Sequence, residues 1–79
     1  MANLEKYSAA LARAKEAALA LEANTEHEEE LGEDLTQAET AIRLGIMSAM
    51  QRELGHGYIV SLCTTQGESS RVKIRKAAF

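Results

Sequence analysis

Apolar residues recur every three or four positions along the first third of the chain. They lie at Leu4, Tyr7, Leu11, Ala14, Ala18 and Leu21. This spacing places them on one face of a helix, in the manner of a coiled-coil seam. Alanine has the highest helix propensity, and its small side chain lets a neighbouring helix approach closely. The pattern therefore predicts a helix over residues 3–23 that packs against another helix.

A second and longer helix is predicted over residues 25–54. Thr25 and Glu28 have the spacing of a capping box, and the glutamates around them would lie at the positive end of the helix dipole. Apolar residues then continue at helical spacing as far as Leu54, and Gly55 supplies a stop. Gly32 lies inside this range, so we expect any kink of the helix near it.

Small residues four positions apart mark the second predicted helix. Glycine destabilises a helix by about 1 kcal/mol relative to alanine, so close contact with another helix is the expected compensation for Gly45. We expect helix packing or dimer contacts at Leu4, Leu11, Ala18, Ala41, Gly45 and Ala49.

The period changes to two after Gly57. Residues 58–65 are rich in β-branched and aromatic side chains, a turn sequence QGES follows, and residues 70–76 alternate basic with apolar side chains. A two-stranded ribbon is marginal by itself, so its apolar face must pack on the helices. The expected fold is α+β, one domain over residues 1–79. An antiparallel helical hairpin precedes a C-terminal two-stranded β-hairpin.

Chain length limits the core that this domain can build. A chain of 79 residues buries only roughly 60% of the surface that it exposes when unfolded. A single cysteine, Cys63, excludes an internal disulfide and favours a reducing compartment. We therefore predict a homodimer, joined through helix seams, hairpin edges or both. No apolar run approaches the ~20 residues of a membrane span, so a cytoplasmic protein without membrane contact is expected.

Acidic residues are concentrated in one part of the chain, although the net charge is only −3. Nine acidic and no basic residues lie between Glu16 and Ile42. Carboxylates in the first turns of a helix commonly stabilise its dipole, whereas those further along can form a binding surface. A partner-binding acidic face is predicted at Glu26, Glu29, Glu30, Glu33 and Asp34.

Basic residues are concentrated at the C-terminal end. Between Ser69 and Phe79 they are Arg71, Lys73, Arg75 and Lys76. Their face could bind a protein partner or the phosphates of a nucleic acid. It could equally protect a strand edge from aggregation or pair with the acidic helix. Nucleic acid is the less favoured ligand, because the isoelectric point is near 5.3 and no aromatic residue is expected on this face to stack a base.

Residues that catalyse reactions or bind metals are few. Cys63 lies within a predicted strand without a neighbour in sequence to activate it, and His56 lies between two glycines in a turn. Glu26, His27 and Glu30 have a helical spacing that could hold a divalent ion, but an H-E-x-x-H motif and cysteine pairs are absent. We expect no catalytic residue, no metal and no cofactor.

Three functional classes remain. The favoured one is a non-enzymatic protein–protein interaction module, a homodimeric inhibitor or adaptor that occupies a surface of a larger macromolecule with an acidic helical face. In size and style the chain is similar to small accessory proteins that phages and mobile elements encode to block host machinery. The alternative is a small nucleic-acid-binding dimer that uses the basic face of the β-hairpin. The third class is an enzyme or ligand-binding protein built at a dimer interface.

Overall fold

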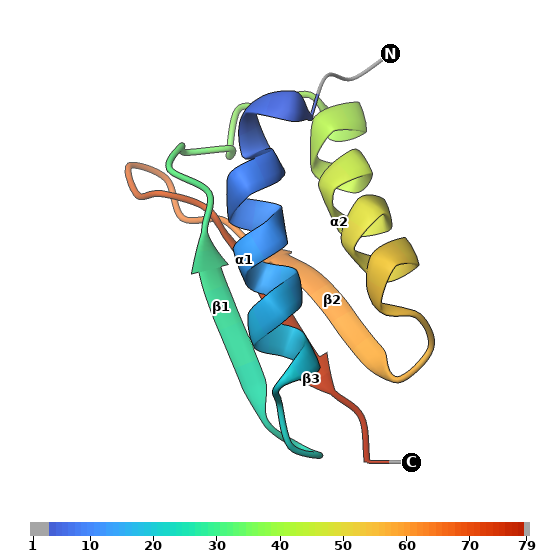
Figure 1. Ribbon diagram of the computed structural model, residues 1–79. Coiled ribbons are helices and arrows are strands. Elements are labelled where there is room, and N and C mark those ends of the chain that lie inside the picture. Colours follow the sequence, from blue (N-terminus) through green and yellow to red (C-terminus); the bar gives the residue numbers. More distant parts are fainter. Residues whose placement is uncertain (1–3, 79) are drawn as a thin grey trace.

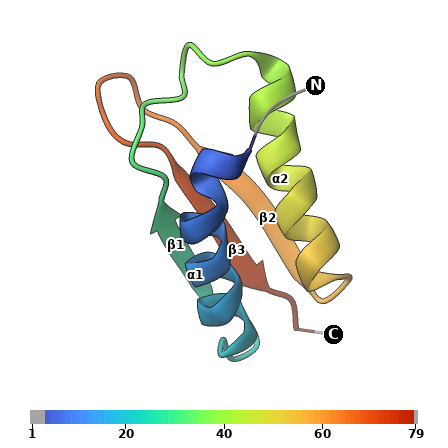
Figure 2. The same ribbon diagram turned by 45° about the horizontal axis from the view of Figure 1, so that its top comes forward.

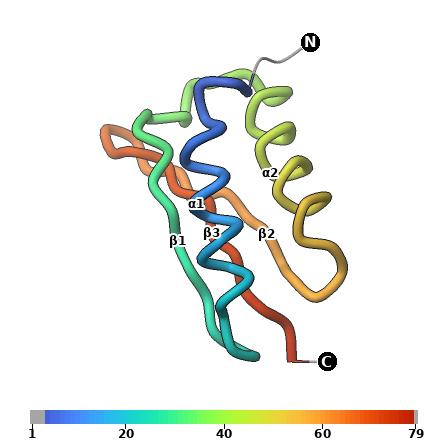
Figure 3. Tube along the Cα trace, viewed as in Figure 1, coloured from blue at the N-terminus to red at the C-terminus, as the bar shows by residue number. Residues whose placement is uncertain are grey.

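The computed structural model describes residues 4–78, which form two α-helices on one face of a three-stranded sheet (Figure 1). In chain order the elements are η1 (Glu5–Tyr7, a 3-10 turn), α1 (Ser8–Leu19), β1 (Glu26–Glu30), α2 (Thr40–Leu54), β2 (Tyr58–Cys63) and β3 (Arg71–Lys76). The strand order is β1-β3-β2, and both pairings are antiparallel. The last strand of the chain therefore lies in the centre of the sheet (Figure 3).

The first predicted helix overlaps η1 and α1. Its buried side chains recur every three or four residues, at Tyr7, Ala10, Ala14 and Ala18. Leu11 is only half-buried, because Ala10 takes the place next to the sheet. The helix ends at Leu19 rather than at residue 23. The chain then turns into β1 through Asn24, whose φ of +66° is one that asparagine tolerates better than most residues.

The long second helix predicted over residues 25–54 is wrong, and so is the two-stranded hairpin. The predicted antiparallel helical hairpin is wrong as well, because β1 lies between the two helices in the chain and α1 and α2 run in the same direction (Figure 1). Residues 26–30 form β1, which pairs with β3 in a register that runs from Glu26↔Arg75 to Glu30↔Arg71. Ordinary residues differ in helix propensity by less than about 0.7 kcal/mol each, so tertiary contacts readily override this preference. Here β1 gains a ladder of backbone hydrogen bonds and a basic side chain opposite each outward-facing glutamate. The acidic segment is consequently a strand.

The segment between β1 and α2 is a loop fixed by two buried leucines, Leu31 and Leu35. Gly32 has a φ of +84°, so the predicted helix kink is in fact the turn that ends a strand. Ser70, the residue before β3, holds this loop because its hydroxyl oxygen accepts a hydrogen bond from the Leu35 N–H at 2.8 Å. The loop then leads to α2, which ends at Gly55 with a φ of +82°.

The core lies between the helices and the sheet, as the turned view in Figure 2 shows. Its large, fully buried side chains include Ile46 and Met50 from α2 and Val72 and Ile74 from β3. The helix α1 packs on β1 and β3, whereas α2 packs on β2. As a result α2 lies along the side of β2 that is turned away from β3, at the edge of the molecule (Figures 1 and 2).

Candidate interaction surfaces

The face of the sheet opposite the helices carries a charged ladder, which we define as Glu26, Glu28 and Glu30 on β1 together with Arg71, Lys73 and Arg75 on β3. Each glutamate lies directly across from a basic residue in the strand register. The Lys73 ammonium is 3.1 Å from a Glu26 carboxylate oxygen, and the Arg71 guanidinium is 3.7 Å from Glu28. The acidic and basic parts of the chain thus neutralise each other within one sheet.

The basic residues predicted to bind a partner are therefore only partly available. The hydrogen bond from Lys73 to Glu26 raises the pKa of that lysine, so the pair is mutually stabilised. Lys76 lies off the ladder, with its ammonium 6.0 Å from the ring centre of Tyr58. Arg75 is exposed on the ladder. A phosphate at this face would have to compete with carboxylates that are already in place.

Glu29 of β1 faces the helices rather than solvent. Its carboxylate accepts hydrogen bonds from the Arg13 guanidinium of α1 at 3.2 Å and from the His27 ring at 3.1 Å. Hydrogen bonding to His27, followed by Arg13, lowers the pKa of the Glu29 carboxyl despite its partial burial. This predicted site residue joins α1 to β1.

The other two predicted acidic site residues beyond β1 also hold the fold together. Glu33 accepts a hydrogen bond from the Tyr7 hydroxyl at 2.8 Å and one from the Lys6 ammonium at 3.1 Å, and these bonds lower its pKa. Asp34 accepts bonds from the hydroxyl and the N–H of Thr36 and, from a distant part of the chain, from the Gly67 N–H at 2.7 Å, and these bonds lower its pKa. Neither residue lies on a helix.

Protonation of these carboxylates at acidic pH should destabilise the folded protein. Their folded pKa values lie below the ordinary values of 4.5 for Glu29 and Glu33 and 3.8 for Asp34. The stability that they contribute is therefore present above those values and is lost as the pH falls through the folded ones. We expect the melting temperature to change little from about pH 7 to 5 and to fall below about pH 4.5. Circular dichroism melts at a series of pH values measure this.

A pair of variants isolates the contribution of Glu29. Glu29→Gln should lower the melting temperature at pH 7 and weaken its acid dependence, whereas Glu22→Gln at an exposed position should leave the profile unchanged. Coinciding pH profiles for the two variants would show that the Glu29 interactions do not contribute.

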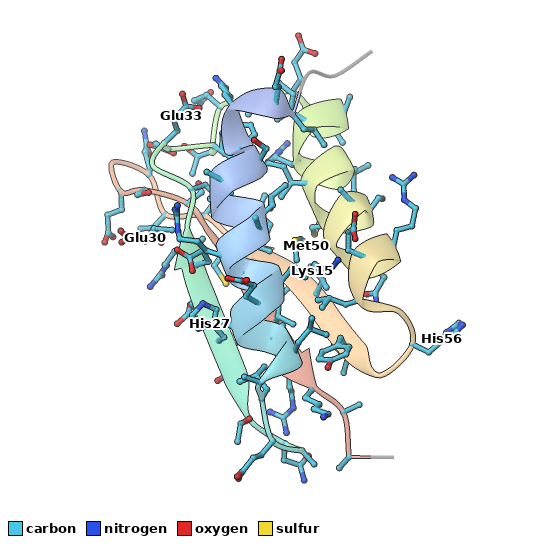
Figure 4. All side chains as sticks on the ribbon, viewed as in Figure 1. Lys15, His27, Glu30, Glu33, Met50 and His56 are labelled. Atoms are coloured by element: carbon cyan, nitrogen blue, oxygen red, sulfur yellow. The ribbon has the colours of Figure 1, made fainter. Side chains whose placement is uncertain are left out.

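Four of the six predicted helix-packing residues come together within one chain. Leu4, Leu11 and Ala49 line a groove of about 410 Å³ between α1 and α2, which the Lys15–Glu53 ion pair (2.9 Å) borders. In Figure 4 Lys15 of α1 and Met50 of α2, two further lining residues, lie between the two helices. Ala18 is fully buried and Ala41 is exposed. A methyl group at Gly45 would lie 3.4 Å from the Leu4 side chain, so this glycine makes room for the start of the same chain.

Residues with catalytic or metal-binding chemistry do not come together. His27 lies on β1 and His56 lies in the turn after α2, on opposite sides of the molecule (Figure 4). Cys63 is a half-buried free thiol at the end of β2. Among residues 4–78 no group of three or more histidine, cysteine, aspartate or glutamate side chains is placed to hold a metal ion.

The outer side of β2 carries unpaired backbone groups. Along an antiparallel strand the N–H and C=O groups point alternately to either side. The Ala77 N–H donates to the Gly57 carbonyl at 3.0 Å on the β3 side, and the register continues from there. The backbone N–H and C=O groups of the odd-numbered residues of β2 therefore point toward β3. Those of Val60 and Leu62 point away from β3, toward the free edge of the sheet. In the described part of the chain, their N–H and C=O groups have no partner.

One end of this edge is closed by α2. The Gln51 side-chain amide donates to the Tyr58 carbonyl at 2.9 Å, which agrees with an outward-facing Tyr58. The same amide group donates to the carbonyl of Gly55 at 2.8 Å. Gln51 thereby satisfies the first outward carbonyl of β2 and leaves the next two residues free.

The other end of the edge opens into an apolar groove of about 200 Å³, which we call the β2 groove. It is lined by Thr40, Arg43, Leu44, Met47, Leu62 and Thr64. Leu44 is 53% exposed, a large value for an aliphatic side chain. Sequence reasoning missed this site. The available signal was that Leu44 and Met47 are apolar residues outside the stripe that faces the core.

Comparison of the chain with known protein families, with curated proteins and with solved structures finds no match. Across residues 4–78, neither helix has the length and apolarity that crossing a membrane requires.

Proposed function

We propose that this protein is a non-enzymatic interaction module that binds an extended segment of a partner protein along β2. The observation that supports this most directly is the unpaired backbone of Val60 and Leu62, next to the β2 groove. An incoming strand satisfies such groups by adding to the sheet. In this mode main-chain hydrogen bonds give affinity, and pockets for alternate side chains give specificity.

Comparison of the two sheet edges supports the choice of β2. The strand β1, at the opposite edge, has the sequence EHEEE, so an approaching strand would meet four carboxylates. Proteins commonly protect their sheet edges in this way. The strand β2 has the sequence YIVSLC, without a charge or a proline, and Ile59 is 56% exposed on its outer face. One edge is thus protected against strand addition, and the other is suited to it.

The alternative nucleic-acid function has weaker support. Lys73 and Arg71 already lie beside glutamates of β1, and phosphate binding would have to break these ion pairs. Four of the five residues of the predicted acidic face are likewise engaged in ion pairs or hydrogen bonds, namely Glu26, Glu29, Glu33 and Asp34. The β2 edge is a surface whose polar groups are still available.

The homodimer expected from chain length stays a prediction. Its formation through two β2 edges is disfavoured, because α2 packs on β2 and lies along its outer side. A second copy would bring its own α2 into the same space above the joined strands. A single extended segment carries no such helix. We therefore propose that the bound strand comes from a different protein, which the module inhibits or tethers by occupying that segment.

The proposal is tested with the peptide acetyl-Thr-Val-Thr-Leu-Thr-Glu-Thr-amide in an NMR titration of the full chain. Four neutral hydrogen bonds contribute about 0.5–1.5 kcal/mol each, or about 2–6 kcal/mol in total, so a dissociation constant on the order of 1 mM is expected. Val60→Pro removes an outward N–H at an edge position, where proline is compatible with a sheet. The variant should fold, as judged by circular dichroism, and bind at least about tenfold more weakly.

Two further peptides keep the test independent of any variant's folding. Each is methylated on alternate backbone nitrogens, one on the even and the other on the odd residues. In an added strand only every second N–H faces β2. One peptide should therefore bind like the parent and the other at least about tenfold more weakly. Equal binding of both peptides, or no binding of the parent, would reject strand addition.

A further inference from the structure

The helix α2 turns one face toward the β2 edge. Thr40, Leu44, Met47 and Gln51 recur on it every three or four residues. Gln51 closes one end of this face through its bond to Tyr58. The remaining residues form the helix wall of the β2 groove, while Leu62 and Thr64 form the strand wall. A strand added to Val60 and Leu62 would run along this groove, with every second side chain directed into it.

Arg43 differs from most cations of this protein in its surroundings. Arg13, Lys15 and Lys73 each lie within 3.2 Å of a carboxylate oxygen. Arg43 lines the β2 groove and is half-buried, yet among the described residues its guanidinium forms only one hydrogen bond, a long one of 3.5 Å to the Thr40 hydroxyl. Within residues 4–78 no carboxylate forms an ion pair with it. A guanidinium has five N–H donors and matches a carboxylate well, so most of its capacity is unused.

We infer that the segment bound at β2 carries an apolar side chain and, two residues away, a carboxylate. The apolar side chain would fill the groove between Leu44, Met47 and Leu62, and the carboxylate would pair with Arg43. Alternate residues of an extended chain share one face, so a spacing of two presents both groups to α2. This inference rests on the proposed function and names the class of partner segment, an extended acidic–apolar peptide.

Peptide variants test the two specificity elements separately. With the wild-type protein, replacing Leu by Ala in the parent peptide should weaken binding about fivefold or more, since the groove loses most of its apolar contact. Replacing Glu by Gln should weaken binding about threefold, and replacing it by Lys about tenfold. Each dissociation constant comes from the same NMR titration.

A charge reversal on the protein provides the matched control. Arg43→Glu should invert the order, so that the Lys peptide binds better than the Glu peptide. Arg52→Glu makes the same charge change two and a half turns further along α2, on the opposite face of the helix, at an exposed position outside the groove, and should leave the order unchanged. Both variants should melt within a few degrees of the wild type, since neither residue is in the core.

The outcomes separate this inference from the function on which it rests. If all peptides bind equally and only backbone methylation matters, strand addition stands and the predicted specificity is wrong. If Arg43→Glu and Arg52→Glu change the order equally, the carboxylate preference reflects overall charge and the role of Arg43 is rejected. If no peptide binds, both the inference and the proposed function fail.

Discussion

Replacing Ile74 with alanine is expected to remove about 2–5 kcal/mol from the free energy of unfolding. Ile74 is fully buried in β3, the central strand, and the deleted methyl groups would leave a cavity among the helices and the sheet. A domain of 79 residues typically has a stability of about 4–12 kcal/mol, so the loss is a large part of the total. Urea denaturation followed by circular dichroism measures it.

Ile59 provides the control for Ile74. It belongs to the neighbouring strand β2, but its side chain is 56% exposed on the outer face. Ile59→Ala should therefore cost less than about 1 kcal/mol. Similar losses for the two substitutions would contradict the placement of the core on the helix side of the sheet.

Ser70→Ala is expected to lower stability by about 1–3 kcal/mol, although it deletes a single oxygen. Ser70 is a fully buried polar residue, and its hydroxyl oxygen accepts the Leu35 N–H at 2.8 Å. Without that oxygen the N–H remains buried and unpaired, which costs its desolvation free energy. The loop between β1 and α2 should loosen, and the urea midpoint should fall.

Ser69 offers a matched comparison one residue earlier. Its hydroxyl oxygen accepts the Gly32 N–H at 3.0 Å, but this bond is exposed, so water can replace the lost oxygen. Ser69→Ala should cost no more than about 1 kcal/mol. If the two serine variants were equally stable, the buried bond to Leu35 would not be holding the loop.

The spacing of apolar residues predicted where several helices and strands lie, but not which segments of the chain pack or pair with each other. The alternation predicted strands over residues 58–65 and 70–76, which overlap β2 and β3, and the helical seam over residues 3–23 overlaps η1 and α1. The failure over residues 25–39 has a clear physical cause. Glutamates after a capping-box spacing favour a helix locally, whereas the ladder that they form with Arg71, Lys73 and Arg75 exists only in the folded sheet.

The candidate site could not be predicted from sequence for the same reason. That β2 is an edge strand follows from β1 pairing on the far side of β3, a contact between distant parts of the chain. The alternation predicts that the side chains of Val60 and Leu62 share one face of their strand, but it does not show that the backbone edge of that strand is unpaired. The matching residues on α2, Arg43 and Leu44, lie off the apolar stripe that predicts the helix, and no spacing in the sequence indicates that they lie beside β2.

Amide hydrogen exchange, resolved by residue, tests the availability of the β2 edge most directly. In the free protein the amides of Val60 and Leu62 should exchange rapidly, whereas those of Ile59 and Ser61, which face β3, should be protected. Adding the parent peptide at about ten times its dissociation constant should slow the two outward amides about tenfold, because they then exchange mainly from the small peptide-free fraction. Protection of Val60 and Leu62 in the free protein, or rapid exchange that persists with peptide bound, would contradict strand addition at β2.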